Sequence, residues 1–87
     1  MAVTIELTYE MTKAFGEQRF DVEVVPTVAD AVKVAEQRLG EKGIQFDELA
    51  RVAAVAVNGV LVNHRKGMKT KLRDGDTVTF VKAAAGG

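Results

Sequence analysis

The stretch from Thr27 to Gly40 has the clearest helical pattern in this chain of 87 residues. Thr27 occupies the N-cap position, and Asp30 supplies the acidic member of a capping-box-like pair and favourable charge in the first turn. Gly40 is expected to end the helix. Apolar residues recur at spacings of three and four, at Val28, Ala31, Val32, Ala35 and Leu39. A helix with one apolar stripe needs a second layer to cover it, and the flanking segments predict a sheet.

Two segments before this helix alternate between apolar and polar residues, which is typical of strands with one buried face. Residues 10–17 lose the alternation and carry charge, so we expect a turn or loop there. The two strands should then pair antiparallel as a hairpin. Pro26 has no N–H to donate and closes the second strand. The predicted core residues of these strands are Val3, Ile5 and Leu7 in the first and Phe20, Val22 and Val24 in the second.

After the helix, the pattern predicts a short helical turn, two strands joined by a tight turn, a polar loop and a final strand. Their positions are residues 44–50, 52–57, 60–62, 64–71 and 77–82, with Asn58-Gly59 and Asp74-Gly75-Asp76 as turns and Val78 and Phe80 facing the core. A helix that connects two strands of one sheet implies a crossover. We therefore expect an α+β fold, with a mixed sheet of four to five strands and one main helix packed on one face.

The composition indicates one small globular domain, because 47% of the residues are hydrophobic and 28% are charged. Twelve basic and twelve acidic residues balance, which argues against nucleic-acid or membrane-surface binding driven by net charge. The chain has no cysteine, hence no disulfide and no thiolate nucleophile. The amino terminus lacks the pattern of a secretory signal, and no apolar run is long enough to span a membrane, so we expect a cytoplasmic protein.

The last five residues, Ala83-Ala84-Ala85-Gly86-Gly87, are expected to be an extended or disordered tail on a domain formed by residues 1–82. Extended, they would reach about 17 Å beyond the domain. Gly86 and Gly87 have no Cβ, so they can enter a channel too narrow for other residues and present a free α-carboxylate. This favours a partner enzyme with a tight slot, although simple terminal fraying is the alternative.

The order of elements resembles that of the ThiS/MoaD-type sulfur-carrier proteins, which have the ubiquitin-like β-grasp fold. The motifs that carry the resemblance are Ala56-Val57-Asn58-Gly59, Leu72 before Asp74-Gly75-Asp76-Thr77-Val78, Phe80, and the terminal Gly86-Gly87. The resemblance implies that the carboxylate of Gly87 is adenylated with ATP by an E1-like (MoeB/ThiF-like) enzyme and converted to a thiocarboxylate. This group then donates sulfur to a downstream synthase or transferase.

In that role Gly87 is the covalent attachment point, and Gly86 and Ala85 give access to the partner's active site. The chain would bind no cofactor or metal and would not itself be an enzyme. ATP and the sulfur donor would be used by the activating partner. We expect a monomer when free, or the small non-catalytic subunit of a synthase such as molybdopterin synthase.

The chain departs from the family's pattern just before the glycines. Molybdopterin-synthase small subunits often carry prolines and a bulky aliphatic residue there, whereas this chain has Lys82 and three alanines. It is also longer than typical thiamine-pathway carriers. The pathway therefore stays open among molybdopterin, thiamine, cysteine, methionine and thionucleoside synthesis. Two alternatives remain: a ubiquitin-like modifier conjugated to lysines through Gly87, and an adaptor domain with an inert tail.

Basic residues concentrate before the last strand, and they are candidates for docking the activating enzyme or a sulfur acceptor. These candidates are Arg65, Lys66, Lys69 and Lys71, together with Lys82. A solvated loop is the alternative, as is a partner-binding patch of exposed apolar residues at Val60, Val62 and Val81. His64 is the sole histidine, which argues against a zinc site.

Overall fold

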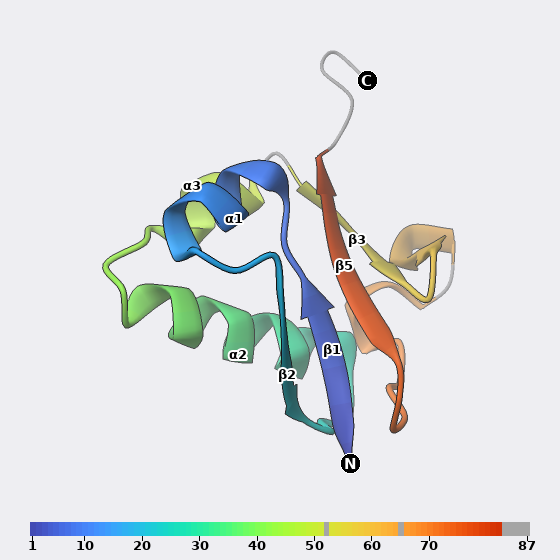
Figure 1. Ribbon diagram of the computed structural model, residues 1–87. Helices are drawn as coiled ribbons and strands as arrows, with labels where there is room; N and C mark the ends of the chain where they lie inside the picture. The colour runs from blue at the N-terminus through green and yellow to red at the C-terminus, as the bar shows by residue number, and fades with distance from the viewer. Residues whose placement is uncertain (52, 65, 83–87) are drawn as a thin grey trace.

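A computed structural model describes residues 1–51, 53–64 and 66–82. In this part of the chain, a five-stranded sheet in the order β2-β1-β5-β3-β4 is covered on one face by helices (Figure 1). The strands are β1 (Ala2–Glu6), β2 (Arg19–Glu23), β3 (Ala53–Val57), β4 (Val60–Leu61) and β5 (Thr77–Lys82). The helices are α1 (Tyr9–Phe15), α2 (Val28–Gly40) and α3 (Phe46–Ala50), with 3-10 turns η1 (Val62–His64) and η2 (Gly67–Lys69). Because β1 and β5 are parallel and the other pairs antiparallel, the predicted mixed α+β sheet is confirmed.

The connection between β1 and β2 is helix α1, so the turn or loop predicted for residues 10–17 is wrong. The hydroxyl of Thr8 caps this helix by accepting a hydrogen bond from the backbone N–H of Met11 at 3.2 Å. Gly16 ends it in the left-handed conformation, at φ 95°. Met11 and Phe15 lie four residues apart and are both buried, which places them on one helix face. The antiparallel pairing of β1 with β2 is confirmed, but it is closed by a helix instead of a tight turn.

Helix α2 begins where its capping signature predicts. The backbone N–H of Thr27 donates to the Asp30 carboxylate at 3.2 Å, and that of Asp30 donates to the Thr27 hydroxyl at 3.4 Å. Gly40 is the last helical residue, but the left-handed backbone comes at Gly43, at φ 77°. The predicted end of the helix at Gly40 is therefore confirmed, although Gly40 itself does not adopt the left-handed conformation. The buried residues of α2 are Val28, Ala31, Ala35 and Leu39.

The segments after α2 follow the predicted order. Helix α3 is the short helical turn expected against the core. Val52, which was predicted to begin the next strand, lies outside the described residues, and β3 starts at Ala53. Asn58 and Gly59 have φ values of 51° and 85°, as a two-residue hairpin turn requires. Strand β4 is shorter than predicted, because Val62 already belongs to η1.

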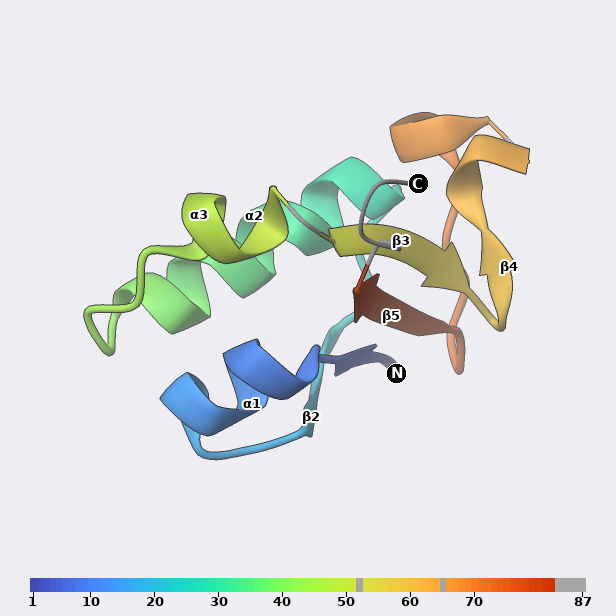
Figure 2. The ribbon, with the colours of Figure 1, turned by 90° about the horizontal axis from the view of Figure 1, so that it is seen from above.

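The core lies between the sheet and the three α-helices (Figure 2). The inward orientation predicted for Val78 and Phe80 is confirmed, with exposed fractions of 0% and 3%. Val24 is the exception among the predicted core residues of the first two strands, since it lies beyond β2 and is exposed. No described helix is both long and apolar enough to cross a lipid bilayer.

The two turn motifs noted in the sequence are bonded to each other. The Asn58 amide group donates to one oxygen of Asp76 at 3.0 Å, and its carbonyl oxygen accepts from the N–H of Thr77 at 2.9 Å. The other Asp76 oxygen accepts from the N–H of Arg73 at 2.8 Å. Gly75, which lies between Asp74 and Asp76, adopts φ 88°, and this confirms the predicted turn. These bonds attach the β3–β4 turn to the start of β5.

We expect Asp76→Ala to lower the free energy of unfolding by about 1–3 kcal/mol, because it leaves the donors from Asn58 and Arg73 without this acceptor. Urea denaturation followed by circular dichroism measures the change. Glu17→Ala is the matched control, since it removes an exposed carboxylate that has no bonded partner among the described residues. A variant as stable as the Glu17→Ala control would show that the network does not hold the turns together.

Candidate functional site

The candidate site is the end of β5, from which the predicted tail continues. Ala85, Gly86 and Gly87 lie outside the described residues. Strand β5 is central in the sheet, between parallel β1 and antiparallel β3. Its last residue, Lys82, is still in register with Ala53. The backbone is therefore held by the sheet up to five residues from the end of the chain.

The tail root consists of the last three residues of β5, which are Phe80, Val81 and Lys82. Phe80 anchors it, because its ring packs edge-on against that of Phe46 with centroids 5.5 Å apart and planes at 82°. Both rings are buried. The contact joins β5 to α3, so the tail root is held by helix packing as well as by strand pairing.

Charged side chains also lie at the tail root. The Lys82 ammonium is 3.8 Å from a carboxylate oxygen of Glu10, and both side chains are substantially exposed. Such an exposed pair adds little stability, but it places Lys82 beside α1. Glu10 was not predicted as a neighbour of the tail root, because the segment that forms α1 has the pattern of a loop. The capping hydroxyl of Thr8 and the apolar pair Met11 and Phe15 were the available signals.

The apolar patch predicted from Val60, Val62 and Val81 is not a single continuous surface. Val62 is buried, whereas Val60 and Val81 are 41% and 37% exposed. Val60 is paired with Val57, which belongs to the core, and Val81 is paired with Ala54. Since paired residues share a face and successive residues alternate, Val60 and Val81 point to opposite faces of the sheet. That hypothesis is wrong for these three residues as a set.

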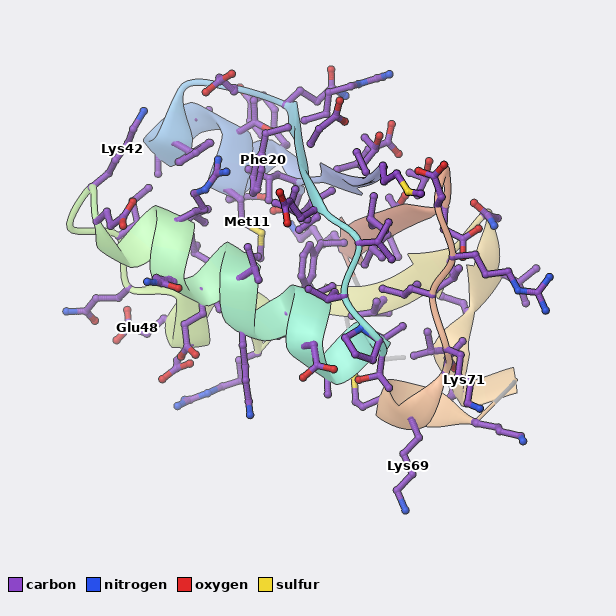
Figure 3. All side chains as sticks on the ribbon, turned by 90° about the horizontal axis from the view of Figure 1, so that it is seen from below. Met11, Phe20, Lys42, Glu48, Lys69 and Lys71 are labelled. Atoms are coloured by element: carbon purple, nitrogen blue, oxygen red, sulfur yellow. The ribbon has the colours of Figure 1, made fainter. Side chains whose placement is uncertain are left out.

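The predicted basic docking residues divide into two places. Lys66, Lys69 and Lys71 are exposed. The backbone of Lys71 forms an isolated antiparallel β-bridge with that of Thr27 at the start of α2. Figure 3 shows Lys69 and Lys71 on the same side of the molecule. Lys82 lies at the far end of β5, about 17 Å along the strand from its start. Arg65 lies outside the described residues.

The part of the chain described here contains no cluster of three or more histidine, cysteine or carboxylate side chains able to hold a metal ion. The side chain of His64 is not among the described ones. Asp74 has a structural role, because its carboxylate accepts a hydrogen bond from the backbone N–H of Ala2 at 2.8 Å. The described surface around β5 thus presents a supported strand end and exposed charged side chains.

A mixed sheet crossed by α2, with the last strand at its centre, defines the ubiquitin-like β-grasp class of protein. Solution-structure coordinates of small archaeal modifier protein 1 from Methanosarcina acetivorans superpose with a TM-score of 0.79 at 20% identity, covering 99% of this chain and 96% of that one. The sequence profile of the ThiS family matches residues 6–87, and the chain belongs to the ThiS family. The resemblance inferred from the sequence is thereby confirmed.

Two further relatives are similar over their whole length. A putative sulfur carrier protein of Archaeoglobus fulgidus is 32% identical, with 100% of both chains covered. A chain in the crystal structure of the BexX/CysO complex of Amycolatopsis orientalis is also 32% identical, with a TM-score of 0.70 and coverage of 99% of this chain and 100% of that one. A homologous chain has thus been crystallised in a complex of two proteins.

Proposed function

We propose that this chain is a sulfur carrier protein and a substrate for other enzymes, with no catalytic role of its own. The observation that carries the proposal is that the ThiS-family match extends to residue 87 and so includes Gly86 and Gly87. The relative from Archaeoglobus fulgidus, a putative sulfur carrier aligned over its full length, supports the same role. The support that β5 receives from β1, β3 and α3 suits a domain that presents its C-terminus to a partner.

The proposed chemistry takes place at the carboxylate of Gly87. A carboxylate is a poor acyl electrophile, so it first attacks the α-phosphorus of ATP, and pyrophosphate leaves. A hydrosulfide-level sulfur nucleophile then adds to the acyl adenylate and expels AMP, which leaves a thiocarboxylate on Gly87. The carrier contributes orientation, because a reacting group held on a rigid body meets the partner's catalytic groups in a defined geometry.

The proposed partners are an E1-like adenylating enzyme of the MoeB/ThiF type and a downstream sulfur-accepting synthase or transferase. ATP and the sulfur donor belong to the activating enzyme. Gly86 and Ala85 form the slender stem that enters its active site. We further propose that the free carrier is monomeric and acts in the cytoplasm.

Intact-protein mass spectrometry tests this function. The chain is incubated with extract of its host, ATP and a sulfur source, and its mass is compared with that of the untreated chain. The expected change is the difference between one sulfur and one oxygen, located at Gly87 by fragmentation. Adenylation without sulfur, together with conjugates of higher mass, would favour the protein-modifier alternative. A chain that is never adenylated would favour an adaptor with an inert tail.

Lys69 and Lys71 are proposed to assist docking of the activating enzyme through long-range attraction. We expect Lys69→Glu and Lys71→Glu each to slow adenylation by roughly threefold to tenfold at low ionic strength, with a smaller effect at high salt. Lys33→Glu on the exposed side of α2 is the matched control. Equal adenylation rates and salt dependence for all three variants would remove these two lysines from the docking surface.

A further inference from the structure

The C-terminal part of α2, the segment after it and the start of α3 line a hollow on the helical side of the molecule, away from Lys69 and Lys71. It is open to solvent and has a volume of about 280 Å³. Most of the surface that lines it is apolar. Ile44 and the largely buried ring of Phe46 contribute to this apolar surface. Gly40 leaves one side open, because a Cβ placed there would meet no atom within 4 Å.

Three carboxylates border this apolar surface. Glu36 comes from α2, and Asp47 and Glu48 come from the first turn of α3. Figure 3 shows Glu48 extending outward from α3. All three side chains are exposed. Within the described residues, the ion pairs are Glu6 with Arg19 and Glu10 with Lys82, so none of these three carboxylates has an ion-pair partner in this part of the chain.

The basic residues nearest to these carboxylates along the chain are not paired with them. Lys33 lies one helical turn before Glu36, and Arg51 follows α3, but neither forms an ion pair in the described structure. Lys42 is directed elsewhere, because its ammonium donates to the backbone carbonyl of Phe15 at 3.1 Å and lies over that ring. The hollow therefore combines an apolar lining with carboxylates that form no ion pair among the described residues.

We infer that this hollow binds a long cationic side chain, lysine or arginine, from a basic segment of a partner protein. Such side chains have an apolar stem and a charged head, so the stem would pack on Ile44 and Phe46 while the head meets the carboxylates of Glu36 and Glu48. A metal ion does not fit, because the described carboxylates do not form a cluster able to hold one. A wholly apolar ligand would leave the negative rim uncompensated.

This inference does not depend on sulfur transfer. It assigns the hollow a partner of opposite charge to the one that Lys69 and Lys71 would attract. The two surfaces are therefore distinguishable by the charge of the peptide that each one binds.

The test is an amide-resolved NMR titration of the full chain at low ionic strength. The probes are acetylated and amidated tri-arginine and tri-lysine peptides, with a tri-glutamine peptide of equal length as the uncharged control. We expect both cationic peptides to shift the backbone amide signals of Gly40, Ile44 and Glu48 saturably, and tri-glutamine to leave them unchanged. Cationic-peptide shifts confined to other surfaces, or equal shifts with tri-glutamine, would overturn the inference.

Three variants and one control separate the effect of charge from that of shape. Glu36→Gln and Glu48→Gln should each weaken binding about two- to fivefold, as expected for one exposed charge pair. Glu23→Gln, an exposed carboxylate on β2, should have no effect. Gly40→Leu should block the hollow without backbone strain, because Gly40 is helical and has space for a side chain. Unchanged binding by both glutamine variants and by Gly40→Leu would refute the assignment.

Discussion

A chain shortened to end at Ala85 is expected to fold like the full chain but to accept neither adenylate nor sulfur. The truncation removes Gly86 and Gly87, which follow Lys82, the last described residue that pairs in the sheet. Stability should therefore remain within about 0.5 kcal/mol of the full chain. Activation should fall by at least about a hundredfold, because the new terminal carboxylate would stop short of the partner's catalytic groups. Pyrophosphate release and intact mass measure the two chemical steps.

Ala83→Gly is the matched control for the truncation, because it keeps the length of the chain and its terminal Gly86-Gly87. It should be activated within about fivefold of the full chain, since the added backbone freedom costs about 1 kcal/mol or less. Gly86→Ala tests the narrow slot separately, because it keeps the length but adds a Cβ. A truncated chain that still received sulfur would rule out Gly87 as the attachment point.

Phe80→Ala is expected to lower the free energy of unfolding by about 3–5 kcal/mol, the usual range for removing a buried aromatic ring. The ring of Phe80 is 3% exposed and packs edge-on against Phe46, so its loss opens a cavity between β5 and α3. Small domains have a total stability of only about 5–15 kcal/mol. Guanidinium denaturation monitored by circular dichroism should therefore show a much lower midpoint.

Val81→Ala gives a control at the adjacent position. Val81 points to the opposite face from Phe80 and is 37% exposed, so the expected loss is below about 1 kcal/mol. The difference between the two variants reports the packing of β5 on the helices and excludes a general intolerance of alanine in this strand. Similar losses in both variants would mean that packing against Phe46 is not what stabilises the tail root.

Local signals in the sequence predicted several elements correctly. Thr27 and Asp30 form the capping box that starts α2, and Asn58 with Gly59 forms the hairpin turn. These predictions succeeded because each depends on residues within four positions of one another, where backbone preferences and short hydrogen bonds decide the conformation. The family motif was likewise contained in short segments, and the ThiS-family match confirmed it.

The predictions that failed concern features with a weak local signal or a tertiary cause. Helix α1 has only seven residues, which is too short to be stable alone, so burial of Met11 and Phe15 stabilises it. Because charged residues surround Met11 and Phe15, their spacing of four was not recognised as helical. The separation of Lys82 from Lys71 also depends on the fold, because β5 carries Lys82 away from the start of α2.

The amino-acid sequence by itself determined the order of the strands and of helices α2 and α3, the inward faces of β1 and β5, and the Gly86-Gly87 ending that led to the family. Tertiary structure alone decided that β5 lies between β1 and β3, that Phe80 meets Phe46, and that α2 and α3 enclose an apolar hollow with an acidic border. The physical reason is the distance along the chain over which each interaction acts. Alternation, capping and turn preferences act between neighbours in the chain, whereas burial and charge proximity act between residues that only folding brings together.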